Sequence, residues 1–109
     1  MKAEIVFADK KLKEAFDKLK ESGTEDRQLY ELLNRAFDDI KNDPSGFIHV
    51  PSDLIPKKYK QKYNIDNLWK YDLPNGWRLL YSLSREKVLL LAIILEWFDH
   101  KNYERRFDY

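Results

Sequence analysis

The stretch that decides the fold is Val88–His100, VLLLAIILEWFDH. It begins with eight consecutive apolar residues, from Val88 to Leu95, and it ends in the polar pair Asp99-His100. A membrane-spanning helix needs about 20 apolar residues, so the run is too short for one. A strand that is apolar on both faces is usually central in its sheet or covered on both sides. The sequence therefore predicts an innermost strand that carries a polar cluster to the rim of the core.

Two stretches in the first half of the chain have the periodicity of amphipathic helices. Apolar residues recur at i, i+3, i+4 and i+7 from Leu12 to Leu19, and the same spacing continues from Leu29 to Ile40. Asp9 is placed to cap the first helix. A glycine after the first helix, Gly23, is suited to end it in a left-handed conformation. We therefore expect a helix hairpin on one face of the sheet.

Short apolar segments and turn residues predict the remaining elements. The predicted strands are residues 3–7, 68–73, 77–83 and 87–98, and a short helix is predicted at residues 57–63. Asn75-Gly76 indicates a type I′ hairpin, and residues 84–86 are the expected second turn. These elements predict one α+β domain over residues 1–109, of order β-α-α-β-β-β. Its four-stranded sheet is mostly antiparallel in the order 1-4-3-2, and a short C-terminal helical tail follows.

Composition and charge restrict the class of protein. A chain of 109 residues without cysteine suits one domain in a reducing compartment. No basic segment followed by a long apolar run opens the sequence, so we expect a cytoplasmic protein. With two histidines and no cysteine, we expect no metal and no cofactor. The net charge is only +1, but a cluster without acids lies within residues 57–62. The lysines of this cluster are Lys57, Lys58, Lys60 and Lys62.

The order of elements and two short motifs resemble the RelE/ParE toxin superfamily, the small toxins of prokaryotic type II toxin–antitoxin pairs. The motifs are GWRLLY at residues 76–81 and HKNY at residues 100–103. In the RelE-like branch, the resemblance implies a metal-independent endoribonuclease that cleaves mRNA on the ribosome and inhibits translation. It also implies a cognate antitoxin protein as partner, no contact with a membrane, and catalytic roles for Arg78, His100 and Tyr103.

The chemistry of RNA cleavage suits these residue types. Without a metal, the 2′-hydroxyl is the nucleophile, and the reaction needs a proton acceptor, a cation beside the phosphate and a proton donor for the leaving oxygen. Histidine exchanges protons near neutral pH, and the arginine guanidinium matches two phosphate oxygens. The expected RNA-binding residues are Lys57, Lys58, Lys60, Lys62, Arg105 and Arg106. Three tyrosines, Tyr59, Tyr63 and Tyr103, are available for base stacking.

Each of these side chains also has a structural interpretation. Arg78 can pair with Asp72 or Glu96 across the sheet, and the lysines can form a solvated helix face. His100 can bond to Asp99 or to a backbone carbonyl. The catalytic interpretation fails if Arg78 and His100 point to opposite faces of the sheet.

Two other functions remain open. One is a ParE-like toxin that inhibits gyrase. The other is a non-catalytic antitoxin-binding module on the same fold, which the near-neutral net charge favours. For such a module, the apolar linker at residues 47–55 and the exposed face of the helix hairpin are the expected contact surfaces.

Overall fold

The protein has an α+β fold, seen here in a computed structural model that describes residues 2–101 and residue 107. The strands are β1 (Glu4–Phe7), β2 (Ile48–His49), β3 (Trp69–Asp72), β4 (Arg78–Glu86) and β5 (Leu89–Phe98). The helices are α1 (Lys10–Leu19), α2 (Thr24–Asn42) and α3 (Lys57–Tyr63). The five strands form one sheet in the order β1-β5-β4-β3-β2, in which β1 runs parallel to β5 and the other pairs are antiparallel.

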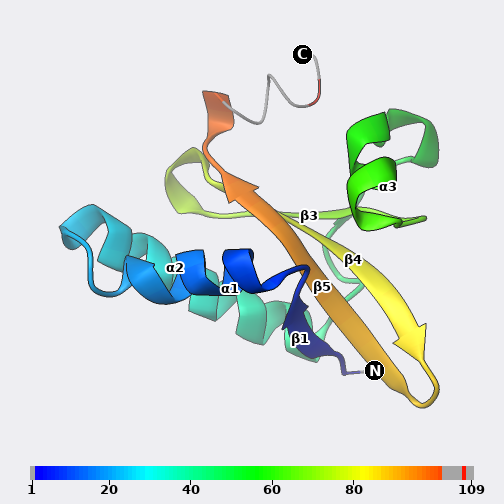
Figure 1. Ribbon diagram of the computed structural model, residues 1–109, viewed down its shortest axis with the longest axis horizontal. Helices are drawn as coiled ribbons and strands as arrows, with labels where there is room; N and C mark the ends of the chain where they lie inside the picture. Colours follow the sequence, from blue (N-terminus) through cyan, green and yellow to red (C-terminus); the bar gives the residue numbers. More distant parts are fainter. Residues whose placement is uncertain (1, 102–106, 108–109) are drawn as a thin grey trace.

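The apolar run forms the central strand, as its composition predicts. β5 lies between β1 and β4, and Figure 1 shows it crossing the middle of the molecule. Ala92 and Ile94 belong to the core under the helix hairpin, whereas Leu95 and Phe98 belong to a second core on the opposite face. The predicted order 1-4-3-2 is confirmed for the four predicted strands.

The structure adds one strand that the sequence did not predict. β2 is only two residues long and pairs with β3, placing Ile48 opposite Lys70 and His49 opposite Trp69. Its sequence has no strand periodicity because two residues are too few to show one. The pairing depends on the edge that β3 offers, so the sheet has five strands rather than four.

The helix hairpin covers one face of the sheet, as expected. Asp9 caps α1, because its Oδ1 accepts a hydrogen bond from the Leu12 backbone N–H at 2.8 Å. The left-handed role expected for Gly23 is wrong: its φ is −54°, and it is the N-cap residue of α2. The chain leaves α1 through hydrogen bonds from the N–H groups of Glu21 and Ser22 to the last carbonyls of the helix, so the turn needs no left-handed residue.

The short helix α3 lies on the other face and has the predicted bounds. Tyr59, a residue of α3, is buried against the sheet and packs in one core with Leu68, Leu80 and Leu95. This second core is smaller than the one under α1 and α2. The sheet is therefore covered on both faces, which accounts for the uniform apolarity of its central strand.

The two hairpin turns differ in how well the sequence located them. Asn75 and Gly76 both have positive φ, 63° and 79°, as the Asn-Gly pair predicts. The turn expected at residues 84–86 is wrong, because β4 continues to Glu86 and the chain reverses at Lys87, whose φ is 54°. Val88 is 91% exposed at this tip, so the apolar run begins outside the core.

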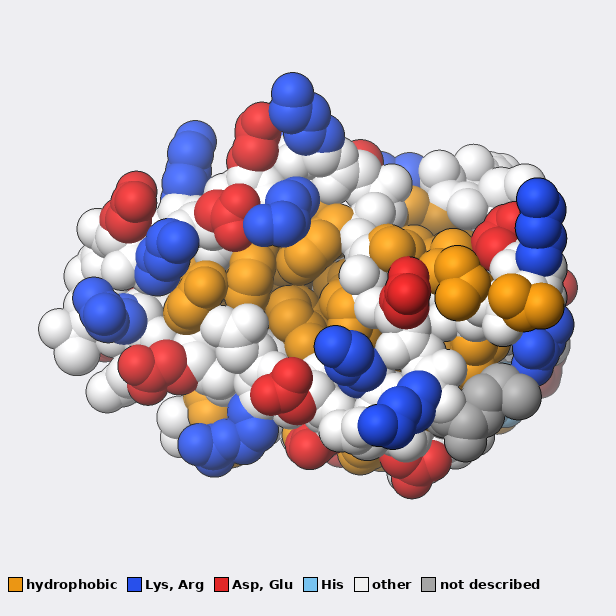
Figure 2. All heavy atoms as spheres, turned by 90° about the horizontal axis from the view of Figure 1, so that it is seen from below, with side chains coloured by type: hydrophobic (Ala, Val, Ile, Leu, Met, Phe, Trp, Pro, Cys, Tyr) orange, Lys and Arg blue, Asp and Glu red, His pale blue; other side chains and the backbone are white. Residues whose placement is uncertain are grey.

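The surface carries both signs of charge. Figure 2 views the molecule from below Figure 1 and shows Lys, Arg, Asp and Glu side chains interspersed around an apolar centre. Within residues 2–101 and 107, no helix is long and apolar enough to cross a membrane. Of the expected helical tail, His100 and Lys101 are helical.

Candidate functional site

The strand ladder places Arg78 on the face covered by α3. Arg78 opens β4 and pairs with Asp72 on one side and Phe98 on the other. Residues that pair across a ladder point to the same face. Because Phe98 belongs to the core under α3, the Arg78 side chain lies on that face.

His100 comes to the same rim. Its Nδ1 lies 3.5 Å from Nη2 of Arg78. The two side chains therefore do not point to opposite faces, and the geometry is compatible with the catalytic interpretation. The contact also depends on Gly76, because a Cβ there would lie 3.3 Å from the Cβ of His100.

The contact constrains the imidazole. A guanidinium can only donate, so a hydrogen bond from Arg78 requires the lone pair of His100 to be on Nδ1. The ring proton is then on Nε2. His100 is exposed at the end of the sheet.

Two charged residues of β3 complete the rim. Asp72 Oδ1 lies 3.1 Å from Nε of Arg78 and 3.3 Å from Nζ of Lys70. The Arg78 contact has the distance of an ion pair but not the alignment of a hydrogen bond. Nη1 of Arg78 also donates to the Trp77 carbonyl at 3.2 Å. Of the two partners expected for Arg78, Asp72 is thus the one that the geometry supports.

The predicted lysine cluster lies on α3. All four of its lysines are exposed: Lys57, Lys58, Lys60 and Lys62. Lys58 and Lys62 line a hollow of about 170 Å³ together with Tyr63 and Glu96. Glu96 pairs with Leu80, the next residue of β4 on the same face as Arg78. The lysines and the Arg78–His100 pair are therefore on one face of the sheet.

One expectation for this face is wrong. Tyr59 was a candidate for base stacking, but it is only 2% exposed because it fills the core under α3. Glu96 lies on the central strand β5. Its carboxylate accepts a hydrogen bond from the Tyr59 hydroxyl at 2.7 Å.

Three predicted site residues cannot be placed. Tyr103, Arg105 and Arg106 lie outside the described residues. The site therefore consists of Arg78, His100 and the α3 lysines, with Lys70 and Asp72 added by the structure. Alternation along β3 gave a signal for this addition, because Leu68, Lys70 and Asp72 share one face of the strand.

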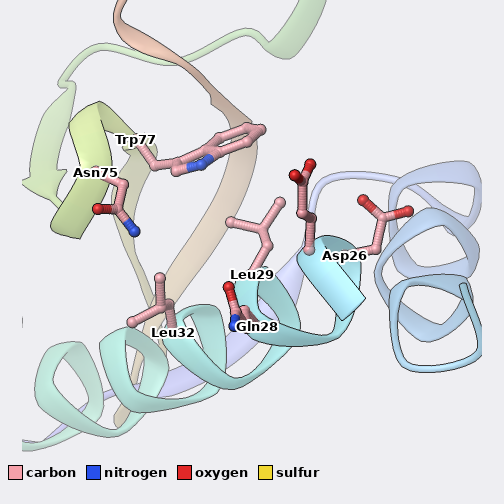
Figure 3. Close-up of a pocket in the computed structure, with 7 residues that line it drawn as sticks. Asp26, Gln28, Leu29, Leu32, Asn75 and Trp77 are labelled. Carbon is pink, nitrogen blue, oxygen red and sulfur yellow. The ribbon is translucent and has the colours of Figure 1, made fainter. Parts of the chain in front are cut away.

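A hollow on the other face has a different chemical character. It measures about 280 Å³ and is lined by Glu25, Asp26, Leu29 and Trp77, among others. Figure 3 shows the Trp77 ring reaching from the β4 side over Leu29, with Asp26 at the start of α2. Its carboxylates would repel a phosphate backbone, and none of the predicted site residues lines it.

Two tyrosines with raised pKa values are on the helix side. Burial and the hydrogen bond to Asp39 raise the pKa of Tyr71 to about 12. Burial also raises the pKa of Tyr81, whose hydroxyl donates to the Pro44 carbonyl at 2.6 Å. Among the residues that the structure describes, no group of three or more His, Asp or Glu side chains could hold a metal ion.

In comparisons with known proteins, the chain matches no protein-family model, no curated protein and no solved structure.

Proposed function

We propose that this protein is a RelE-like toxin of a type II toxin–antitoxin pair, a metal-independent endoribonuclease that cleaves mRNA on the ribosome. The observation that supports this most is the 3.5 Å approach of the Arg78 guanidinium to the His100 imidazole at an exposed rim. An exposed row of lysines on the same face supplies the charge that a phosphate backbone needs. In this proposal the partners are mRNA, the ribosome and a cognate antitoxin, and the setting is the cytoplasm.

The proposed reaction is a transesterification. The 2′-oxygen of the RNA forms a bond to phosphorus and loses its proton to solvent water, while the bond from phosphorus to the 5′-oxygen breaks. The products are a 2′,3′-cyclic phosphate and a 5′-hydroxyl. Arg78 stabilises the charge that develops on the phosphate oxygens. His100, in its imidazolium form, donates a proton to the leaving 5′-oxygen and is left as the neutral imidazole.

The test compares cleavage of mRNA by the wild type and by two variants, with and without translating ribosomes. Arg78→Ala and His100→Ala should each lower the cleavage rate by about 100-fold to 10,000-fold, the usual contribution of a proton donor or a charge-stabilising group. Lys87→Ala is the matched control, because Lys87 is at the opposite tip of the β4–β5 hairpin. Absence of cleavage by the wild type, or full activity of both variants, would refute the mechanism.

A second candidate is a non-catalytic module that binds an antitoxin. Ile48 and Leu54 favour it, since they are 47% and 57% exposed within the linker expected to contact a partner. Harmless expression of the chain alone, together with a stable complex with the product of a neighbouring reading frame, would support the module. A supercoiling assay would separately detect a ParE-like inhibitor of gyrase.

A further inference from the structure

We propose that Lys70 and Arg78 form a binding site for an RNA phosphate, and that Asp72 occupies this site as a displaceable counter-ion. The identity of the ligand rests on the proposed function. The site itself rests on the contacts of these three side chains. Asp72 would then act as a built-in competitor that lowers the affinity of the protein for RNA.

The first argument is the convergence of two cations on one oxygen. Lys70 Nζ and Arg78 Nε approach the same atom, Oδ1 of Asp72, at 3.3 Å and 3.1 Å. Lysine and arginine side chains that converge in this way also bind a phosphate oxygen. The carboxylate therefore stands where an oxygen of a phosphodiester would bind.

The second argument is the unequal exposure of the three side chains. The side chains of Lys70 and Arg78 are only 16% and 18% exposed, whereas that of Asp72 is 45% exposed. The cations are held by the sheet, but the carboxylate faces solvent at the end of β3. Asp72 can rotate into water, where it is well solvated, without opening the core.

The third argument is the position of the site. Arg78 also contacts His100, so a phosphate bound between Lys70 and Arg78 would lie beside the proposed proton donor. The α3 lysines are on the same face and can hold the neighbouring nucleotides. Exchange of Asp72 for a phosphate would place the scissile group where the proposed reaction needs it.

An alternative role for Asp72 predicts the opposite result. If the carboxylate only positions Arg78, its removal should weaken RNA binding, because the guanidinium would lose its orientation. If it competes with phosphate, its removal should strengthen binding. The sign of the change therefore decides between the two roles.

The experiment measures binding of a fluorescent 2′-O-methyl RNA oligonucleotide, which cannot be cleaved because its 2′-oxygen is blocked. We expect Asp72→Asn to bind about fivefold more tightly at low salt, the effect of one unit charge a few ångströms away. Asp38→Asn is the matched control. Asp38 is exposed on α2, and α2 covers the other face of the sheet. Lys70→Ala should weaken binding in both the wild-type and Asp72→Asn backgrounds.

Two further measurements locate the effect. The salt dependence of binding should steepen for Asp72→Asn, because one more phosphate contact displaces cations from single-stranded RNA. The NMR signals of the His100 ring should move at a lower concentration of inorganic phosphate in Asp72→Asn than in the wild type. Weaker or unchanged binding by Asp72→Asn would overturn the proposal, whereas inactivity toward cleavable RNA would refute only the proposed function.

Discussion

The two faces of the sheet differ in the kinds of side chain that they carry. The face under α1 and α2 carries a large core rich in aromatic side chains, including Phe16 and Phe37. The face under α3 has a smaller core, and ionisable groups stand directly beside it: Lys70, Asp72, Arg78 and Glu96. Placing charges beside a core is costly unless they are paired. The comparison indicates that the first face mainly stabilises the fold, whereas the second face holds the charged groups of the candidate site.

The largest expected difference concerns the two cores. Leu33 and Leu68 are both fully buried, Leu33 under the helix hairpin and Leu68 under α3. Leu33→Ala should lower the free energy of unfolding by about 4 kcal/mol and Leu68→Ala by about 2.5 kcal/mol, because the short α3 can move into the cavity more readily. Urea unfolding measures both values. If Leu68→Ala lowered the free energy of unfolding more than Leu33→Ala does, the larger core would not be the main source of stability.

Two buried tyrosines sharpen the same comparison. Tyr81 donates to the buried Pro44 carbonyl, whereas Tyr59 donates to the carboxylate of Glu96, which is only half-buried. Tyr81→Phe should cost about 1–2 kcal/mol because the carbonyl loses a partner. Tyr59→Phe should cost less, since water can reach the carboxylate, and it should alter RNA binding while Tyr81→Phe does not. Denaturant titration measures the stability of the two variants, and an oligonucleotide-binding assay measures their affinity for RNA.

The alkaline pH dependence of stability should depend on the helix side of the molecule. Burial and Asp39 raise the pKa of Tyr71 to about 12, so the folded protein holds this proton more tightly than the unfolded chain does. The associated stability is present below pH 10 and is lost as the pH rises toward 12. Tyr71→Phe should therefore show a shallower loss of stability between pH 10 and pH 12. An unchanged slope in chemical denaturation would contradict this.

The smallest effect is expected where neither face is involved. Val88 is 91% exposed at the tip of the β4–β5 hairpin. Val88→Ser should change the free energy of unfolding by less than about 0.5 kcal/mol, as exposed substitutions usually do. A loss above 1 kcal/mol in the same urea assay would show that the tip packs against something.

Local patterns predicted most of the elements correctly. The spacing of Leu12 to Leu19 and the capping aspartate Asp9 locate α1, and the apolar run locates the central strand. These features depend on neighbours within a few residues along the chain. They could be predicted because helix periodicity and capping are local properties.

What the sequence missed depends on contacts between distant segments. Nothing local shows that Tyr59 is buried against Glu96, or that Ile48 finds an edge of β3 to pair with. The turn at Lys87 was displaced because the register of β4 and β5, rather than the polar residues before it, sets the reversal. The shared contact of Lys70 and Arg78 on Asp72 likewise follows from the hairpin register.

The parallel pairing of β1 with β5 has a consequence for synthesis of the chain. Ile5 pairs with Ala92, so nearly the whole chain must be made before β1 has a neighbour. The β3–β4 hairpin can form earlier, since its strands are joined by a short turn. Contacts between residues so far apart in sequence form slowly. β5 supplies side chains to both cores, so a nascent chain that lacks β5 cannot complete either core. The rim of Arg78 and His100 therefore cannot form until β5, which pairs with the start of β4, has been synthesised.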